Sequence, residues 1–156
     1  MKKIDWKNLS YYDFIGFVAV TAILLFALYF GGLWYATYDY RIQMRDQMVG
    51  MYQQLPEPLP VVSEDYGVHQ RWLVFYIDGV KILNKPQPEN VINEYKKALE
   101  KEGWDAEREY VRNDKNKTYG INMRKGEFIL SVSARENRDS INIHLIKRDW
   151  IYHMGL

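Results

Sequence analysis

An uninterrupted apolar run, Phe17-Val-Ala-Val-Thr-Ala-Ile-Leu-Leu-Phe-Ala-Leu-Tyr-Phe30, decides the class of this protein. Around it, no charged residue occurs from Phe14 to Tyr38. At about 1.5 Å per residue, a helix of about 25 residues is roughly 37 Å long, which is enough to cross a hydrocarbon core of about 30 Å with some tilt. We therefore expect residues 14–38 to form one membrane-spanning helix with the lipid bilayer as its surroundings.

Aromatic residues flank this run, as in the headgroup belts of membrane helices. They are Trp6, Tyr11 and Tyr12 on one side and Tyr29, Trp34, Tyr35, Tyr38 and Tyr40 on the other. A cleaved signal peptide has a shorter apolar region, of about 7–15 residues, and small residues at its cleavage site. Here the best cleavage position, after Ala36, has the bulky Trp34 two residues upstream. We therefore expect an uncleaved signal anchor.

The flanking charges favour one orientation. Lys2, Lys3 and Lys7 precede the run, partly offset by two aspartates, whereas Asp39 follows it before the next arginine. Because cytoplasmic flanks carry the excess of Lys and Arg, we expect residues 1–13 in the cytoplasm and the C-terminal part of the chain outside it. The expected location is the cell (inner) membrane, crossed once.

Two small residues four positions apart, Ala27 and Gly31, lie within the run. Such spacing lets two membrane helices approach closely, so these residues are the candidates for helix pairing and self-association. The ordinary composition of membrane helices, which are rich in small residues, explains them as well.

The segment after the run predicts an amphipathic stalk that continues the membrane helix. It contains no proline from Tyr40 to Leu55, and Met44, Met48 and Met51 recur at helical spacing. Such a stripe packs on the chain's own domain, pairs with a partner or second copy, or lies on lipid. We take the three methionines as candidate partner contacts, because methionine adapts to irregular surfaces.

A proline-rich segment, Leu55-Pro-Glu-Pro-Leu-Pro60, follows the stalk. Alternating prolines forbid a helix and favour an extended, semi-rigid conformation. We therefore expect residues 39–60 to be stalk and linker, and residues 61–156 to be a separate domain held away from the stalk.

The domain begins with a run rich in aromatic and β-branched residues, Arg71 to Ile77, which predicts a strand that ends in a turn at Asp78-Gly79. Residues 80–83 are a second short strand in this interpretation. The next segment predicts a helix from Pro88 to Glu102, stopped by Gly103.

A charged, weakly apolar segment at 106–112 then predicts an edge strand. Alternating apolar and polar residues predict further strands at 119–124, 128–135 and 141–145, with a tight hairpin at Lys125-Gly126. A meander with one apolar face needs a cover, and the single amphipathic helix provides one. The expected fold is α+β, a two-layer domain of one helix packed on a sheet of four or five mainly antiparallel strands.

The end of the helix resembles a pattern in small membrane- or lipid-anchored exported bacterial domains of unknown function. The pattern, Y-x-x-A-L-x-x-x-G-W, is formed here by Tyr95, Ala98, Leu99, Gly103 and Trp104. The resemblance covers about half of the chain and rests on core and cap residues, so it implies a fold and a location but no active site. The chain departs from the pattern in having no cysteine to carry a lipid.

The composition limits the chemistry. Without cysteine there is no disulfide, thiolate metal site or cysteine nucleophile. With Lys+Arg 21 against Asp+Glu 20, the near-neutral charge argues against nucleic acid as a partner. His69, His144 and His153 are isolated in the sequence, and the serines have no evident base. We therefore expect no catalytic, cofactor-binding or metal site.

The C-terminal tail is the remaining candidate contact surface. It contains Trp150 and Tyr152, of types that often anchor interfaces, although simple packing on the domain also explains them. The preferred hypothesis is a non-enzymatic accessory or scaffold protein that presents its outer domain to a membrane or cell-envelope protein. The alternative is a sensor or ligand-binding module that binds an anion on its polar sheet face, through Arg124, Arg135, Asn142 and His144.

Overall fold

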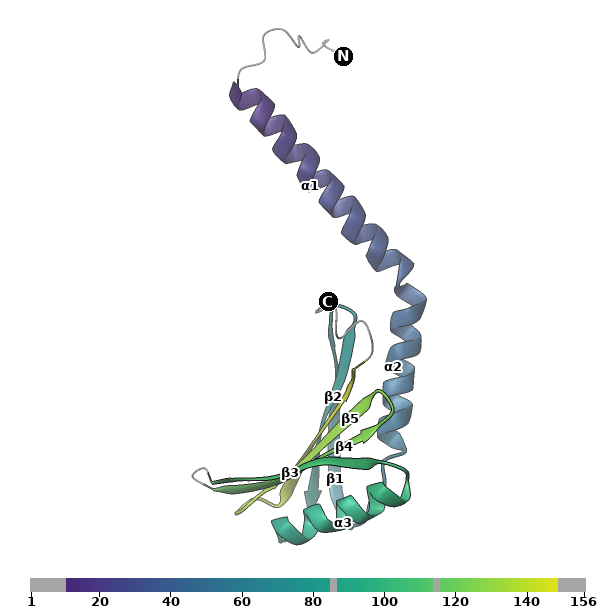
Figure 1. Ribbon diagram of the computed structural model, residues 1–156, viewed down its shortest axis with the longest axis vertical. Coiled ribbons are helices and arrows are strands. Elements are labelled where there is room, and N and C mark those ends of the chain that lie inside the picture. The colour runs from purple at the N-terminus through teal and green to yellow at the C-terminus, as the bar shows by residue number, and fades with distance from the viewer. Residues whose placement is uncertain (1–10, 85–86, 114–115, 149–156) are drawn as a thin grey trace. The chain divides into compact units, whose positions relative to one another are not determined.

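The computed structural model describes residues 11–84, 87–113 and 116–148 (Figure 1). The chain divides into two compact units, Met1–Arg41 and Ile42–Leu156. We describe each unit by itself. The second unit begins at Ile42, whereas the sequence led us to expect a separate domain only from residue 61.

The first unit contains helix α1, Tyr11–Ala36. Its segment Phe14–Ala36 has 23 residues; the most apolar 18 consecutive residues have a mean hydropathy of 2.4, and none of them is buried inside the structure. Thr21 Oγ1 donates to the carbonyl oxygen of Phe17 at 2.9 Å, so the one hydroxyl in the middle of the run is satisfied within the helix. By length and composition this helix is able to cross a membrane, as predicted.

Helix α2, Tyr38–Gln53, follows after Thr37. The hydrogen-bond pattern passes through this residue, because Thr37 N donates to Leu33 O and Arg41 N donates to Thr37 O, each at 3.0 Å. The structure therefore has a second helix where the stalk was predicted, but α1 and α2 are separate helices.

The second unit contains one antiparallel sheet of six strands in the order β1-β2-β6-β5-β4-β3. The strands are β1 Val61–Arg71, β2 Val74–Leu83, β3 Asp105–Asn113, β4 Lys117–Lys125, β5 Phe128–Arg135 and β6 Ser140–Lys147. The α+β class and the antiparallel meander are confirmed, but the predicted count of four or five strands is wrong. The strand missed is β1, an edge strand exposed along most of its length, so its sequence shows no apolar alternation.

The first hairpin differs from the prediction as well. Strand β2 continues through Asp78 and Gly79, where we expected a turn. The chain turns instead at Trp72, whose φ of 57° lies in the left-handed region. An Asp-Gly pair is a reliable turn signal only where tertiary packing does not itself require a glycine at that position.

Gly79 is required by a close contact. A Cβ added at this position would collide with the side chain of Tyr52. Tyr52 belongs to helix α2 and reaches β2. Tyr52 is buried, and its ring packs against Tyr66 of β1 with 4.8 Å between centroids. The glycine therefore lets helix α2 approach the sheet.

Helices α2 and α3 cover the same face of the sheet. Helix α3, Pro88–Lys101, packs on β3, β4 and β5, and α2 contacts β1 and β2 through Tyr52. The core between the helices and this face includes Met48, Tyr95, Leu99, Ile121, Val132 and Ile143, each at most 1% exposed. We predicted one covering helix; the sheet has two, because the expected stalk belongs to the core.

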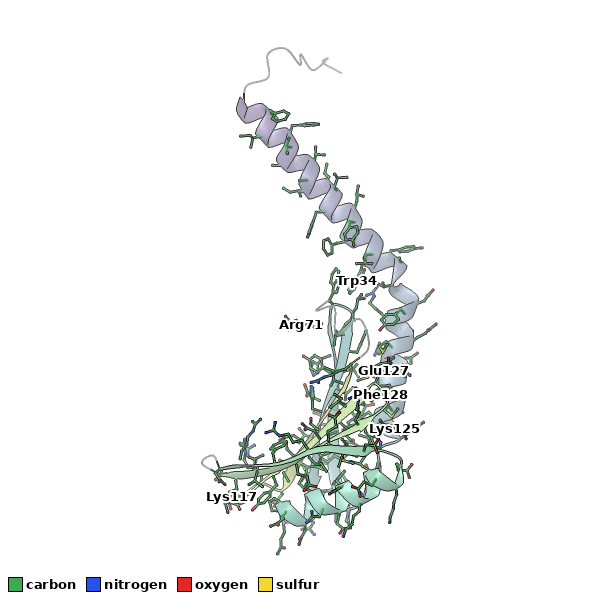
Figure 2. All side chains as sticks on the ribbon, viewed as in Figure 1. Trp34, Arg71, Lys117, Lys125, Glu127 and Phe128 are labelled. Carbon is green, nitrogen blue, oxygen red and sulfur yellow. The ribbon has the colours of Figure 1, made fainter. Side chains whose placement is uncertain are left out.

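The ends of α3 and of the hairpins follow the sequence prediction. Trp104 N donates to Leu99 O at 3.0 Å and Gly103 N donates to Glu100 O at 3.1 Å, with Gly103 at φ 79°, which is a Schellman cap. The β4–β5 hairpin turns at Gly126, with φ 61°. Lys125, Glu127 and Phe128 mark this hairpin in Figure 2.

We expect Gly79→Ala to destabilise the domain by about 1–3 kcal/mol, because the added methyl overpacks the contact with Tyr52. The matched control is Gly50→Ala in α2, where no atom lies within 4 Å of an added Cβ. That change should stabilise the domain by about 0.5–1 kcal/mol through helix propensity. Thermal unfolding of the full chain in detergent measures both. Equal effects of the two substitutions would contradict the packing described for Gly79.

Candidate functional site

The sheet has one covered face and one open face. No helix covers the second face within the described residues. The open face includes Asp65, His69, Tyr76, Asp78, Val80, Ile82, Asn142, His144, Ile146, Ile129, Ser131, Ser133, Arg135, Thr118, Asn122, Arg124, Arg108, Tyr110 and Arg112. Side chains alternate along a strand, so these residues lie between the buried ones in the sequence of each strand.

Three side chains from neighbouring strands meet on this face. His144 Nδ1 of β6 donates to Asp78 Oδ1 of β2 at 2.6 Å, and His69 Nε2 of β1 lies 3.8 Å from Asp78 Oδ2. The three side chains are about half exposed, at 43% to 54%. Because the carboxylate accepts from Nδ1, it leaves Nε2 as the acceptor of the neutral His144 ring.

An aromatic ring supports this cluster. Tyr76 stacks on His69 with 5.1 Å between centroids and an angle of 20°, and its centroid lies 5.5 Å from that of His144. The cluster therefore combines one carboxylate, two imidazoles and a flat ring on an exposed surface.

The register extends the cluster into a row across four strands. Ser131 of β5 lies directly opposite His144, and Ser131 Oγ donates to Asn122 Oδ1 of β4 at 2.9 Å. No base was evident near the serines in the sequence, and strand register is what places His144 beside Ser131. No signal along the chain identifies this row, because Asp78, Asn122, Ser131 and His144 are distant in sequence.

The side chains of this row are arranged to form hydrogen bonds with a ligand and are not arranged for covalent catalysis. The Ser131 hydroxyl is bonded to Asn122, and no hydrogen bond joins it to His144 in the described structure, so the pair lacks the contact of an activated nucleophile. Among the described residues, no three His, Asp or Glu side chains are placed to hold a metal ion.

The four residues predicted to bind an anion, Arg124, Arg135, Asn142 and His144, do share the open face. They do not converge on one point. Arg124 NH1 pairs with Glu107 at 3.1 Å, and Arg135 Nε donates to Thr118 Oγ1 at 3.4 Å. His144 is bonded to Asp78, as described above.

The predicted partner contacts have different environments. Met44 and Met48 are buried, at 5% and 0% exposed, so they are not accessible to a partner. Of the three uses proposed for the methionine stripe, these two residues serve packing within the chain's own domain. Met51 is half-buried. Trp150 and Tyr152 lie outside the described residues.

The candidates for helix pairing lie on α1. Ala27 and Gly31 are both exposed, and no atom lies within 4 Å of a Cβ added at Gly31. Pairing through them stays a prediction.

A buried ion-pair cluster lies on the covered face. Lys81 is 2% exposed, and its Nζ lies 2.5 Å from Glu57 Oε1 and 3.3 Å from Glu64 Oε1. Glu57 belongs to the proline-rich segment, and Leu55 of the same segment is buried. The segment expected to hold the domain away from the stalk is instead fixed to the sheet.

Two tyrosines border this cluster. Burial raises the pKa of Tyr52 above its ordinary value of 10.0, and Glu64 beside its hydroxyl raises it further. Burial also raises the pKa of Tyr95, with a smaller contribution from the charges of Glu57 and Glu64. Both phenols are therefore neutral in the folded domain well into the alkaline range.

A shallow hollow of about 230 Å³ lies between the first turns of α3 and strands β3 and β4. Glu89, Asn93, Glu109 and Tyr119 are among its lining residues. Glu109 is already paired with Lys96, whose Nζ lies 2.6 Å from its Oε1. The hollow is half open and small, so we do not assign it a ligand.

Comparison with known proteins gives no relative. No family model, no curated protein and no solved structure matches the chain. The resemblance of the α3 end to exported bacterial domains accordingly stays a prediction.

We expect Glu57→Gln/Glu64→Gln to destabilise the domain by roughly 3 kcal/mol, because it leaves the Lys81 ammonium buried without a counter-charge. Lys81→Met should cost less, about 1 kcal/mol or below, because the two carboxylates are partly exposed and able to turn to water. Denaturant unfolding of the full chain in detergent gives both values. The reverse order would show that Lys81 is not desolvated.

We also expect alkaline pH to weaken the domain. Groups with a raised folded-state pKa contribute stability that is complete below their unfolded pKa, here 10.0, and is lost as the pH rises toward the folded value. Unfolding measured between about pH 8 and pH 11 should therefore show a steeper loss in the native chain than in Tyr52→Phe/Tyr95→Phe. Parallel pH profiles of the two proteins would exclude these tyrosines as the cause.

Proposed function

We propose that this chain is a non-enzymatic accessory protein that α1 anchors in the cell membrane and that presents its α+β domain, outside the cytoplasm, to a protein of the cell envelope. The single observation that carries the proposal is that one chain contains a helix able to cross a membrane and a packed domain with a sheet face that no helix of the described residues covers. An anchored domain with an uncovered polar face is suited to holding a partner.

The aromatic residues at the end of α1 support the anchored arrangement. The Arg41 guanidinium lies 3.4 Å from the centroid of the Trp34 ring, and its NH2 donates to the Trp34 carbonyl oxygen at 2.9 Å. A cation held on a tryptophan is typical of the headgroup layer, where both groups find polar surroundings. This contact supports placing the end of the span near Trp34.

A second candidate function is a sensor or ligand-binding module. The contacts of His69 and His144 with Asp78 favour it, because a half-exposed imidazole and carboxylate cluster beside a flat ring suits a small polar ligand. A monomer whose unfolding temperature rises with small molecules would favour this module, whereas a stoichiometric protein partner would favour the accessory role.

Topology is testable directly because the chain has no cysteine. We expect Arg138→Cys, in an exposed turn, to react with a membrane-impermeant maleimide in intact cells. Lys3→Cys should react only after the cells are lysed. The reverse labelling, or a chain found in the aqueous fraction without detergent, would contradict the proposed anchor and orientation.

The partner is tested by purification of the tagged full chain in a mild, uncharged detergent. We expect a second protein in a fixed ratio after size-exclusion chromatography. The control is the same tag on a chain whose α1 is followed by an unrelated domain, which should lose the partner. A chain that elutes alone under these conditions would contradict the accessory role.

A further inference from the structure

Apart from Arg124, which pairs with Glu107, the arginines of the open face differ from the lysines of the covered side in how they are neutralised. On the covered side, Lys81, Lys96 and Lys147 each lie within ion-pair distance of a glutamate. On the open face, Arg108, Arg112 and Arg135 make no ion pair with any described carboxylate. We call these three residues the arginine corner.

The register places the arginine corner at one end of the outer strands. Arg112 of β3 and Arg135 of β5 both lie opposite Thr118 of β4, so their backbones are two strand spacings, about 10 Å, apart. Arg108 lies opposite Asn122, four residues back along β3. Lys117, labelled in Figure 2, marks the end of β4 next to Thr118.

Neighbouring groups hold two of these guanidiniums. Arg135 Nε donates to Thr118 Oγ1 at 3.4 Å, and the Arg112 guanidinium lies 5.4 Å from the centroid of the Tyr110 ring. The Tyr110 ring itself lies on Gly120, where no Cβ would fit. Because a guanidinium carries five N–H donors, these contacts orient the side chains and leave donors unused.

The surface beside the arginine corner has the composition of a protein interface. Val80 and Ile82 of β2 are 41% and 43% exposed, and a neutral strip that includes Ser133 and Asn142 separates them from the arginines. Arginine and tyrosine beside exposed aliphatic residues are typical of protein-binding surfaces, and flatness suits a polypeptide better than a small molecule.

We propose that the arginine corner docks an acidic segment of a partner polypeptide. The aspartate or glutamate carboxylates of that segment take the unused N–H donors of Arg108, Arg112 and Arg135, and its apolar residues lie on Val80 and Ile82. Charge complementarity selects the partner, because no described carboxylate of the domain pairs with these arginines. This inference rests on the proposed function and names the chemistry of the partner.

The test uses the full chain in an uncharged detergent and a fluorescent octaglutamate peptide as the probe, followed by anisotropy at low salt. We expect Arg112→Glu/Arg135→Glu to weaken binding at least about tenfold. The affinity of Arg112→Lys/Arg135→Lys should lie between those of the native chain and the glutamate variant, because lysine keeps the charge but lacks the planar, bidentate donors of arginine. The control, Arg45→Glu/Lys101→Glu, makes the same change in net charge at exposed positions on α2 and α3 and should leave binding unchanged.

Three results would overturn the proposal: no binding of octaglutamate by the native chain, equal weakening by the control variant, or clear preference for inorganic polyphosphate or anionic lipid vesicles over the peptide. Thermal unfolding of every variant shows that it is folded. If this test fails but a stoichiometric envelope partner still co-purifies, the arginine corner is not the docking site and the accessory role stands. If the peptide does not bind and no partner co-purifies, the accessory role is contradicted as well.

Discussion

The structure of the outer domain depends on burying one face of a six-stranded sheet beneath two helices. Met48 of α2, Tyr95 and Leu99 of α3 and Ile143 of β6 meet in this layer, each almost completely inaccessible to water. Burial of apolar surface is the dominant favourable term in folding, so both helices are integral to the domain. Since the glycine at 79 lets α2 approach, one backbone position without a side chain decides how close the first helix lies.

The same constraint accounts for the charges. Lys81 lies under the helices and requires counter-charges, which Glu57 and Glu64 provide. Glu57 comes from a proline-rich segment that is too stiff to fold back far, so its ion pair also fixes that segment to the sheet. The arginines of the opposite face are under no such requirement, because water solvates them in the free protein. Among the described residues, the buried lysine is therefore neutralised within the domain, whereas three arginines of the opposite face are left to water.

The regions predicted well were those whose pattern is local. Helix α3, its cap at Gly103, and strands β4 to β6 follow from period and turn residues close together in the chain. Strand β1 was missed because an exposed edge strand has no apolar face to create alternation. The turn at Asp78-Gly79 was wrong because the contact that requires a glycine comes from Tyr52, more than twenty residues away. The candidate site was predicted least well, because only strand register brings the residues from Asp78 to Asn122 together in a row.

The sequence by itself determined that the chain carries a helix long and apolar enough to cross a membrane, an α+β domain and no cysteine chemistry. Each of these is a property of composition or of short-range period, which needs no partner strand to be visible. The tertiary structure alone decided that Met44 and Met48 belong to the core, that His69, Asp78 and His144 meet, and that one sheet face stays open. Those facts depend on which strands pair and which face the helices cover, and such long-range packing leaves no mark on neighbouring residues in the sequence.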